Sequence, residues 1–255
     1  MSGEEFFREI EHREVPWGER WVHVPVFYQD ATTISALFPA SLRKIQGLLP
    51  SPRIRPIRVS LRRGLLSITA HEFRRSDIGP YNEVGISIPF TLDSSAPVLR
   101  NIFGRQRGDP RIYIHHLPVT TEIARDLGVE FAGYPKFVAE IGFEDQTEWR
   151  MCRLEADQQH VLTFGVRKLA LHDSARSRVH CYTFRNGMLL RSEMIGSERK
   201  VGSSENHTDV RLDLGHHPIA QELKDLEIGR AIGLSHAPGY QIILTPVIES
   251  IPSRP

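Results

Sequence analysis

Residues 129–138 read Val129-Glu130-Phe131-Ala132-Gly133-Tyr134-Pro135-Lys136-Phe137-Val138. A lysine follows a Gly-Tyr-Pro turn and begins an apolar stretch, which predicts a strand over residues 136–144. Pro135 favours a strand start because its φ angle is fixed and it carries no N–H. If Lys136 points inward, the low dielectric disfavours its charged form, and a neutral amine is what attacks a ketone. The residues alone leave a surface lysine at a turn as the alternative.

A second segment, Tyr81-Asn82-Glu83, follows a Gly-Pro turn and precedes an apolar run that ends near Phe90. A carboxylate at the mouth of a buried strand can pair with a base, bind a polar substrate atom or move a proton. A half-exposed strand residue is the alternative that Glu83 leaves open.

Short β-like segments dominate the rest of the chain, because β-branched and aromatic residues alternate with polar ones between turn residues. Helices are expected at 33–46, although Pro39 interrupts it, at 120–127, ending at Gly128, and at 218–226. The polar stretch 197–207 predicts a loop or hairpin end. Further strands are expected at 20–28, 54–60, 64–71, 83–90, 111–117, 148–155, 160–168, 178–185, 188–195, 208–214 and 239–249.

This pattern predicts a β-rich α+β fold, with residues 1–255 as a single domain. The domain is expected to be a mostly antiparallel β-barrel or cone-like sheet with a few peripheral helices. Residues 1–15 are charged and are expected to fray or to form a short helix.

Composition excludes several classes of protein. The formal net charge of +1 argues against a nucleic-acid partner, and the arginine-rich stretch 43–63 lacks the interleaved aromatics that such binding needs. No window approaches eighteen consecutive apolar residues, so no membrane span is expected. The start of the chain does not have the pattern of a signal peptide. The two cysteines, Cys152 and Cys181, make no disulfide framework. We therefore expect a cytoplasmic protein.

The lysine and glutamate segments, in this order, resemble the acetoacetate decarboxylase family. That family has a Tyr-Pro-Lys or Phe-Pro-Lys motif preceded by a Gly-x-Glu step, matched here by Tyr134-Pro135-Lys136 after Gly128-Val129-Glu130. The family's tyrosine-then-acid strand start is similar to Tyr81-Asn82-Glu83. Arg20, ahead of Asp30 across an aromatic-rich strand, resembles the family's arginine that pairs with the strand acid.

The resemblance covers roughly residues 18–145 and implies roles for individual residues. Lys136 would form a Schiff base, Glu83 would shape the polar end of the pocket, and Arg20 would hold Glu83 or attract a carboxylate substrate. A lysine activated by its surroundings is a known property of acetoacetate decarboxylases. The implied enzyme is a carboxy-lyase that decarboxylates a small β-keto acid such as acetoacetate without a metal or organic cofactor. The implied assembly is a homo-oligomer.

Two departures from the family pattern keep other functions open. Phe137 stands where the decarboxylases have a second lysine, and residues 66–70 contain no acid. Glu72 is the nearest acid, at a position that does not match. Imine formation survives these changes more readily than decarboxylation itself. The alternatives are a Schiff-base aldolase or dehydratase acting on 2-oxo acids and a non-catalytic small-molecule-binding relative.

Two further side chains are candidates for substrate contacts. Tyr134 is expected to form a pocket wall. His115 and His116 are adjacent in a predicted strand and should point to opposite faces. One of them, taken as His116, is therefore expected to reach the pocket. No two histidines have His-x3-His spacing, so no metal site is expected.

Overall fold

The computed structural model describes residues 5–8, 10–93, 110–198 and 200–254. Of the N-terminal segment expected to fray, residues 1–4 and 9 lie outside this part. The rest of that segment forms helix α1 and begins strand β1. The helices are α1 Glu5–Arg8, α2 Leu42–Leu48, α3 Glu122–Ala132, α4 Pro218–Asp225 and the 3-10 turn η1 His207–Asp209.

The described strands are short to medium in length, except for the long β3 and β5. They are β1 Arg13–Trp17, β2 Arg20–Val24, β3 Val26–Ser41, β4 Ile54–Pro56, β5 Arg63–Ser76, β6 Tyr81–Leu92, β7 Arg111–His116, β8 Glu140–Asp145, β9 Trp149–Ala156, β10 Gln159–Arg167, β11 His172–Asp173, β12 Arg176–Arg185, β13 Met188–Glu198, β14 Lys200–Ser204, β15 Val210–Leu214, β16 Gly233–Leu244 and β17 Glu249–Pro252.

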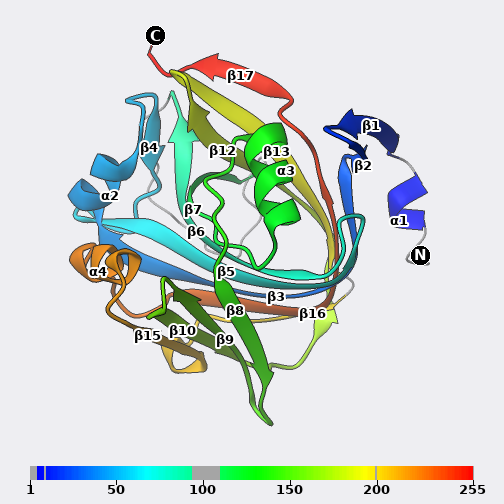
Figure 1. Cartoon of the computed structure of the whole chain (residues 1–255). Helices are drawn as coiled ribbons and strands as arrows, with labels where there is room; N and C mark the ends of the chain where they lie inside the picture. Colours follow the sequence, from blue (N-terminus) through cyan, green and yellow to red (C-terminus); the bar gives the residue numbers. More distant parts are fainter. Residues whose placement is uncertain (1–4, 9, 94–109, 199, 255) are drawn as a thin grey trace.

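The large sheet closes on itself into a ring. Its strands follow the order β16-β3-β5-β6-β7-β12-β13, and β13 pairs again with β16. Among the described ladders only β7 and β12 run parallel. A smaller sheet, β15-β10-β9-β8, lies against the outside of the ring. Helix α3 lies over the open end of the ring (Figure 1). The prediction of a β-rich, mostly antiparallel, ring-like fold with few helices is confirmed. The assignment of residues 1–255 to one domain stays a prediction.

Alternation along β5 and β6 explains why both faces of the ring wall are buried. The even-numbered residues Leu66, Ile68 and Ala70 pack in the main core with the outer sheet. The odd-numbered Thr69 and His71 line a cavity inside the ring. Successive strand residues point to opposite faces, so one strand supplies the core on one side and the cavity on the other.

The helix expected over residues 33–46 is wrong for most of its length. Residues up to Ser41 belong to β3, and α2 begins at Leu42. Ile34, Ala36 and Phe38 are buried at every second position, which is the period of a strand and not of a helix. The β-branched residues before Ile34 favour the same conformation.

Several boundaries also differ from expectation. Helix α3 continues past Gly128 to Ala132, β8 begins only at Glu140, and β16 ends at Leu244. β4 covers only the first half of the expected strand at 54–60. The stretch expected as a loop at 197–207 contains the end of β13 and all of β14, and residue 199 lies outside the described part. These differences arise from long-range pairing that local pattern does not show.

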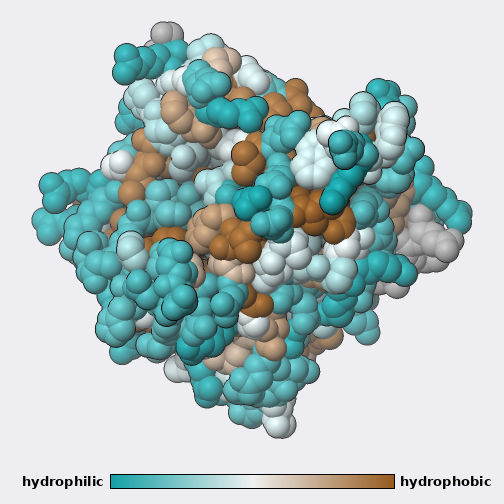
Figure 2. Space-filling model, viewed as in Figure 1, coloured by the Kyte–Doolittle hydropathy of each residue, from teal (hydrophilic) through white to brown (hydrophobic). Residues whose placement is uncertain are grey.

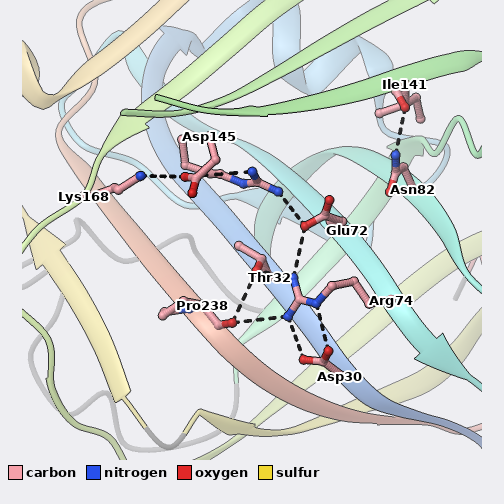
Figure 3. A network of polar contacts seen from close by, with 10 residues as sticks. Asp30, Thr32, Glu72, Arg74, Asn82, Ile141, Asp145, Lys168 and Pro238 are labelled. Atoms are coloured by element: carbon pink, nitrogen blue, oxygen red, sulfur yellow. Dashed lines mark hydrogen bonds and ion pairs between the residues drawn. The ribbon is translucent and has the colours of Figure 1, made fainter. Parts of the chain in front are cut away.

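A polar network joins the outer sheet to the ring wall (Figure 3). Arg74 of β5 binds Asp30 of β3, with a shortest N–O distance of 2.6 Å, and also binds Glu72 at 3.0 Å. Glu72 in turn accepts from Arg150 of β9 at 2.5 Å. These contacts, together with the bond from Asn82 Nδ2 to the Ile141 carbonyl oxygen at 2.8 Å, fix the outer sheet beside β5 and β6.

The face of the molecule drawn in Figure 2 is largely hydrophilic, and apolar residues gather around α3. Within the described ranges, no helix has the length and apolar character needed to cross a membrane.

Candidate active site

Lys136 and Glu83 form a buried ion pair. Lys136 Nζ donates to Glu83 Oε2 at 2.7 Å. The side chain of Lys136 is 2% exposed and that of Glu83 is 12% exposed. Burial removes both charged groups from water, which costs free energy. The attraction between the ammonium and the carboxylate must offset this cost. The inward-pointing alternative for Lys136 is therefore the one that the structure has.

The two residues, distant in sequence, meet because Val119 joins their segments. Val119 bridges Glu83 on one side and Val138 on the other. Its N–H donates to the Phe137 carbonyl oxygen at 2.9 Å, and its own carbonyl accepts from Ala139 N–H at 2.9 Å. The lysine segment thus runs beside the start of β6 before β8 begins, and Phe137 is partly buried and packs against the main core.

Helix α3 sets the position of the lysine through two glycines. Gly133 ends the helix with a φ angle of 64°, a left-handed conformation that glycine adopts without strain. Gly128 lies on the helix face against the lysine stem. A Cβ atom placed on Gly128 would lie 2.6 Å from Cδ and 2.7 Å from Cε of Lys136. The Gly-x-Glu step noted in the sequence is therefore a point of close packing against Lys136.

The Gly128→Ala variant is expected to lose about 100-fold in turnover rate, because the added methyl group must displace the amine of Lys136 by roughly 1 Å. The fold should survive, since alanine favours the helix and the atoms that must move belong to a flexible side chain. Gly142→Ala is the matched control, because a Cβ at Gly142 meets nothing within 4 Å. A Gly128→Ala variant with wild-type turnover would show that the lysine is not held by this contact.

Three tyrosines surround the amine. Lys136 Nζ lies 5.5 Å from the ring centroid of Tyr81 and 5.7 Å from that of Tyr134. The Tyr28 and Tyr81 hydroxyls share a hydrogen bond at 2.9 Å, and Tyr134 bonds Ser192 Oγ at 2.7 Å. Burial raises the pKa of both Tyr81 and Tyr134 well above its usual range, so these phenols remain neutral hydrogen-bonding groups.

His71 is a site residue that the sequence analysis missed. It lies opposite Glu83 in the β5–β6 ladder and shares a hydrogen bond with Thr33 Oγ1 at 2.8 Å. Burial lowers the pKa of His71 to about 4, against a smaller opposing effect of Glu83. The imidazole is therefore neutral near pH 7. The sequence did contain a signal for His71. Thr69, His71 and Phe73 are spaced two residues apart, so in a strand all three lie on one face.

Stability should fall in acid because of His71. The unfolded chain binds a proton on this residue below a pH of about 6.5, whereas the folded chain binds it only near pH 4. Protonation therefore favours the unfolded state. Between a pH of about 7 and about 4.5, wild type should lose about 2–3 kcal/mol more than His71→Asn. Urea unfolding of both proteins at the two pH values measures this difference. Equal losses would show that His71 is protonated in the folded state.

Two small cavities adjoin the ion pair. One, of about 80 Å³, is lined by Glu83, His71 and Cys181 among others. The other, of about 30 Å³, is lined by Lys136 and Gly128 and extends to β2. Tyr28, Tyr134 and Leu244 line both. Since about 10–15 Å³ of such space admits one water molecule, the larger cavity fits a ligand of roughly six non-hydrogen atoms.

Arg20 does not hold Glu83, which was one of the two roles expected for it. It is exposed in β2, opposite Trp17 of β1. Within the described residues, no hydrogen bond or ion pair joins Arg20 to Glu83. Asp30 pairs with Arg74 instead. The role of holding Glu83 belongs to Lys136, and the physical reason is that β2 forms a separate hairpin with β1 outside the ring.

His116 is also not at the cavity. Strict alternation would place it on the face of Ile112 and Ile114, which line the larger cavity. However, the ladder to β6 pairs Ser87 with Ile114 and Ile86 with His116, which leaves His115 as an extra residue. This β-bulge turns His116 to the outer face of the ring. There both histidines contact Glu222 of α4.

The fold and this geometry define a class of protein: a ring-like β fold that encloses a lysine–glutamate ion pair beside a small cavity. Residues 13–247 match the family model described as acetoacetate decarboxylase. The chain therefore belongs to the acetoacetate decarboxylase family, and the resemblance found in the lysine and glutamate segments is confirmed.

Solved structures share the fold at low sequence identity. A solved structure of acetoacetate decarboxylase is 16% identical to this chain, the match covers 93% of this chain and 91% of the other, and the TM-score is 0.63. The acetoacetate decarboxylase of Legionella pneumophila is 14% identical, with coverages of 92% and 93% and a TM-score of 0.65. The enduracididine biosynthesis enzyme MppR, complexed with a condensation product of pyruvate and imidazole 4-carboxaldehyde, is 12% identical, with coverages of 89% and 88% and a TM-score of 0.63. A search of curated proteins gives no significant match.

Proposed function

We propose that this protein is a decarboxylase of a small β-keto acid such as acetoacetate, and that Lys136 forms a Schiff base with the substrate ketone. The observation that carries the proposal is the placement of one almost fully buried amine against one carboxylate, 2.7 Å apart, beside a cavity of about 80 Å³. A buried amine that shares its proton with a neighbouring acid can become the neutral nucleophile that imine formation requires.

In the proposed mechanism, Glu83 takes a proton from Lys136, and Nζ attacks the substrate ketone carbon. The carbinolamine accepts a proton from Glu83 on its hydroxyl group and loses water, which leaves a protonated imine. The bond to the carboxylate then breaks, carbon dioxide leaves, and its electron pair enters the imine to give an enamine. Protonation of the enamine carbon and hydrolysis of the imine release the ketone and restore the amine. Lys136 supplies the nucleophile and Glu83 the proton transfers up to the imine, while solvent supplies the proton for the enamine carbon and the water for hydrolysis.

The lining of the cavities supports decarboxylation over reactions that keep the carboxylate. Among the described residues that line the two cavities, residues 94–109 being outside that part, Lys136 is the only lysine or arginine. A substrate carboxylate there would lie against tyrosine rings and aliphatic side chains, beside the negative charge of Glu83. Such surroundings disfavour the charged carboxylate. They therefore favour decarboxylation, in which the negative charge of the carboxylate moves into the imine as carbon dioxide leaves.

Arg20 and Tyr134 have supporting roles in this proposal. Arg20 is exposed in the strand whose His23 and Val24 line the smaller cavity, so it would attract the substrate carboxylate during approach. Tyr134 contacts both cavities and would form the wall against the bound ketone.

The second candidate is a Schiff-base aldolase or dehydratase acting on a 2-oxo acid. The solved structures of MppR, which hold pyruvate or its condensation product, show such ligands on the same fold. Phe137 favours this candidate too, because the second lysine of the decarboxylases is replaced by a residue that packs in the core.

Product analysis separates the candidates. The protein is incubated with acetoacetate, and separately with pyruvate plus a small aldehyde. Acetone and carbon dioxide in equal amounts from acetoacetate are expected. Condensation or dehydration of pyruvate without carbon dioxide would replace the proposal with the second candidate. No turnover with a panel of oxo acids, together with measurable binding, would identify a binding protein on this fold.

A further inference from the structure

Two histidines and a glutamate converge on the outer face of the ring, away from Lys136. His115 Nε2 lies 2.8 Å and His116 Nε2 lies 3.0 Å from the same oxygen, Glu222 Oε1. One ligand atom from each of the three residues lies within 4.8 Å of the others. None of the three is among the residues lining the two cavities, so the proposed decarboxylation does not use them.

The backbone of β7 builds one half of this cluster. Because of the β-bulge at His115, two adjacent imidazoles point to one side of the strand, with ring centroids 4.2 Å apart. Bulges re-aim side chains in this way and are common next to functional sites. A regular strand would have sent one of these histidines into the ring.

Helix α4 builds the other half. Pro218 occupies its first turn, and the His217 side chain caps its N-terminus by accepting from the Ile219 N–H at 3.2 Å. Ile219 and Leu223 are buried, which fixes the rotation of the helix. Glu222, three residues after Ile219 and next to Leu223, is therefore held toward β7 with a side chain only 33% exposed.

The donor set suits a transition metal better than it suits a simple ion pair. Both imidazoles face the same carboxylate oxygen. The three potential ligand atoms, His115 Nε2, His116 Nε2 and Glu222 Oε1, therefore lie close together. In a tetrahedral zinc site with bonds of about 2.0–2.1 Å, ligand atoms lie about 3.3 Å apart. The nitrogen–oxygen distances here need to lengthen by only a few tenths of an ångström. Nitrogen ligands exclude calcium and magnesium as preferred ions, and the partial exposure of all three side chains leaves room for water as a fourth ligand.

We propose that His115, His116 and Glu222 bind one divalent transition-metal ion, with Zn²⁺ the best match, and that the ion ties β7 to α4. The role is structural. Ile112 and Ile114 of the same strand line the larger cavity, so the ion would fix the strand that forms the cavity wall. Binding to the folded chain alone would stabilise it in proportion to the logarithm of metal concentration.

Calorimetric titration with Zn²⁺, after dialysis against a chelator, tests the proposal on the full chain. One ion per chain is expected, with a melting temperature that rises with metal concentration. His115→Ala, His116→Asn and Glu222→Gln should each weaken binding by at least about 10-fold, since even residues outside the first coordination sphere have effects of this size. His172→Ala and Glu122→Gln, both exposed and outside the cluster of potential ligands, should bind as wild type does.

The variants' melting curves without metal establish that they fold, and Glu222→Gln keeps the shape of the side chain should a histidine variant fail. Co²⁺ serves as a second probe, since a tetrahedral site of this kind gives strong visible absorption that Glu222→Gln should abolish. Zinc binding of wild-type strength in the folded Glu222→Gln variant, or no binding to wild type, would overturn the proposal.

Discussion

The Lys136→Met variant should lose turnover by about four orders of magnitude or more, because methionine fills the same space but cannot form an imine. Substrate binding should persist, since the tyrosines and the cavity remain. The measurement is acetone release from acetoacetate under saturating and limiting substrate. Lys200→Met is the matched control, because Lys200 is exposed in β14 and should keep full activity.

The contrary result is a folded Lys136→Met protein that retains activity within about ten-fold of wild type. That result would exclude a covalent role for this amine. Unfolding curves of the variant are needed alongside, because removing the ammonium leaves Glu83 without its partner.

The second large effect is on stability and concerns the pair as a unit. Glu83→Leu alone leaves a buried ammonium without a counter-charge, and Lys136→Met alone leaves a buried carboxyl group. Each single variant should lose about 3–5 kcal/mol of unfolding free energy, whereas the double variant should lie near wild type or above it. Urea unfolding at neutral pH of the four proteins in this cycle gives the coupling energy.

Additive losses in the double variant would contradict this account. They would mean that the two side chains contribute independently and that the 2.7 Å contact is not maintained in solution. If the double variant is stable but inactive, the pair is retained for chemistry and not for folding.

Part of the candidate site could be predicted from sequence because its signals are local. The Gly-Tyr-Pro-Lys turn marks Lys136, and the tyrosine-then-acid strand start marks Glu83. The resemblance implied that both residues belong to one pocket, but it gave Arg20 and not Lys136 as the partner of Glu83, so their pairing across Val119 was not predicted. Most strands were predicted because the alternation of apolar and polar residues between turn residues can be recognised in short stretches of sequence.

The rest of the site and fold depended on the register in which strands pair. Short stretches of sequence do not contain this information. His71 became a site residue because it lies opposite Glu83 in the β5–β6 ladder. His116 was misplaced because one extra residue in β7 reverses the faces of those that follow. The helix expected at 33–46 was wrong as far as Ser41 because tertiary pairing with β5 extends β3 through Pro39. The homo-oligomeric state stays a prediction.

The central claim is that Lys136 forms an imine with a small oxo acid. The most direct measurement is reduction with borohydride in the presence of acetoacetate, and separately of pyruvate, followed by peptide mass spectrometry. The account predicts a stable adduct on the peptide that contains Lys136, with the mass of the reduced acetone or acetoacetate imine, and none in Lys136→Met. Absence of an adduct on Lys136 with every oxo acid tested, or equal labelling of the exposed Lys200, would contradict it.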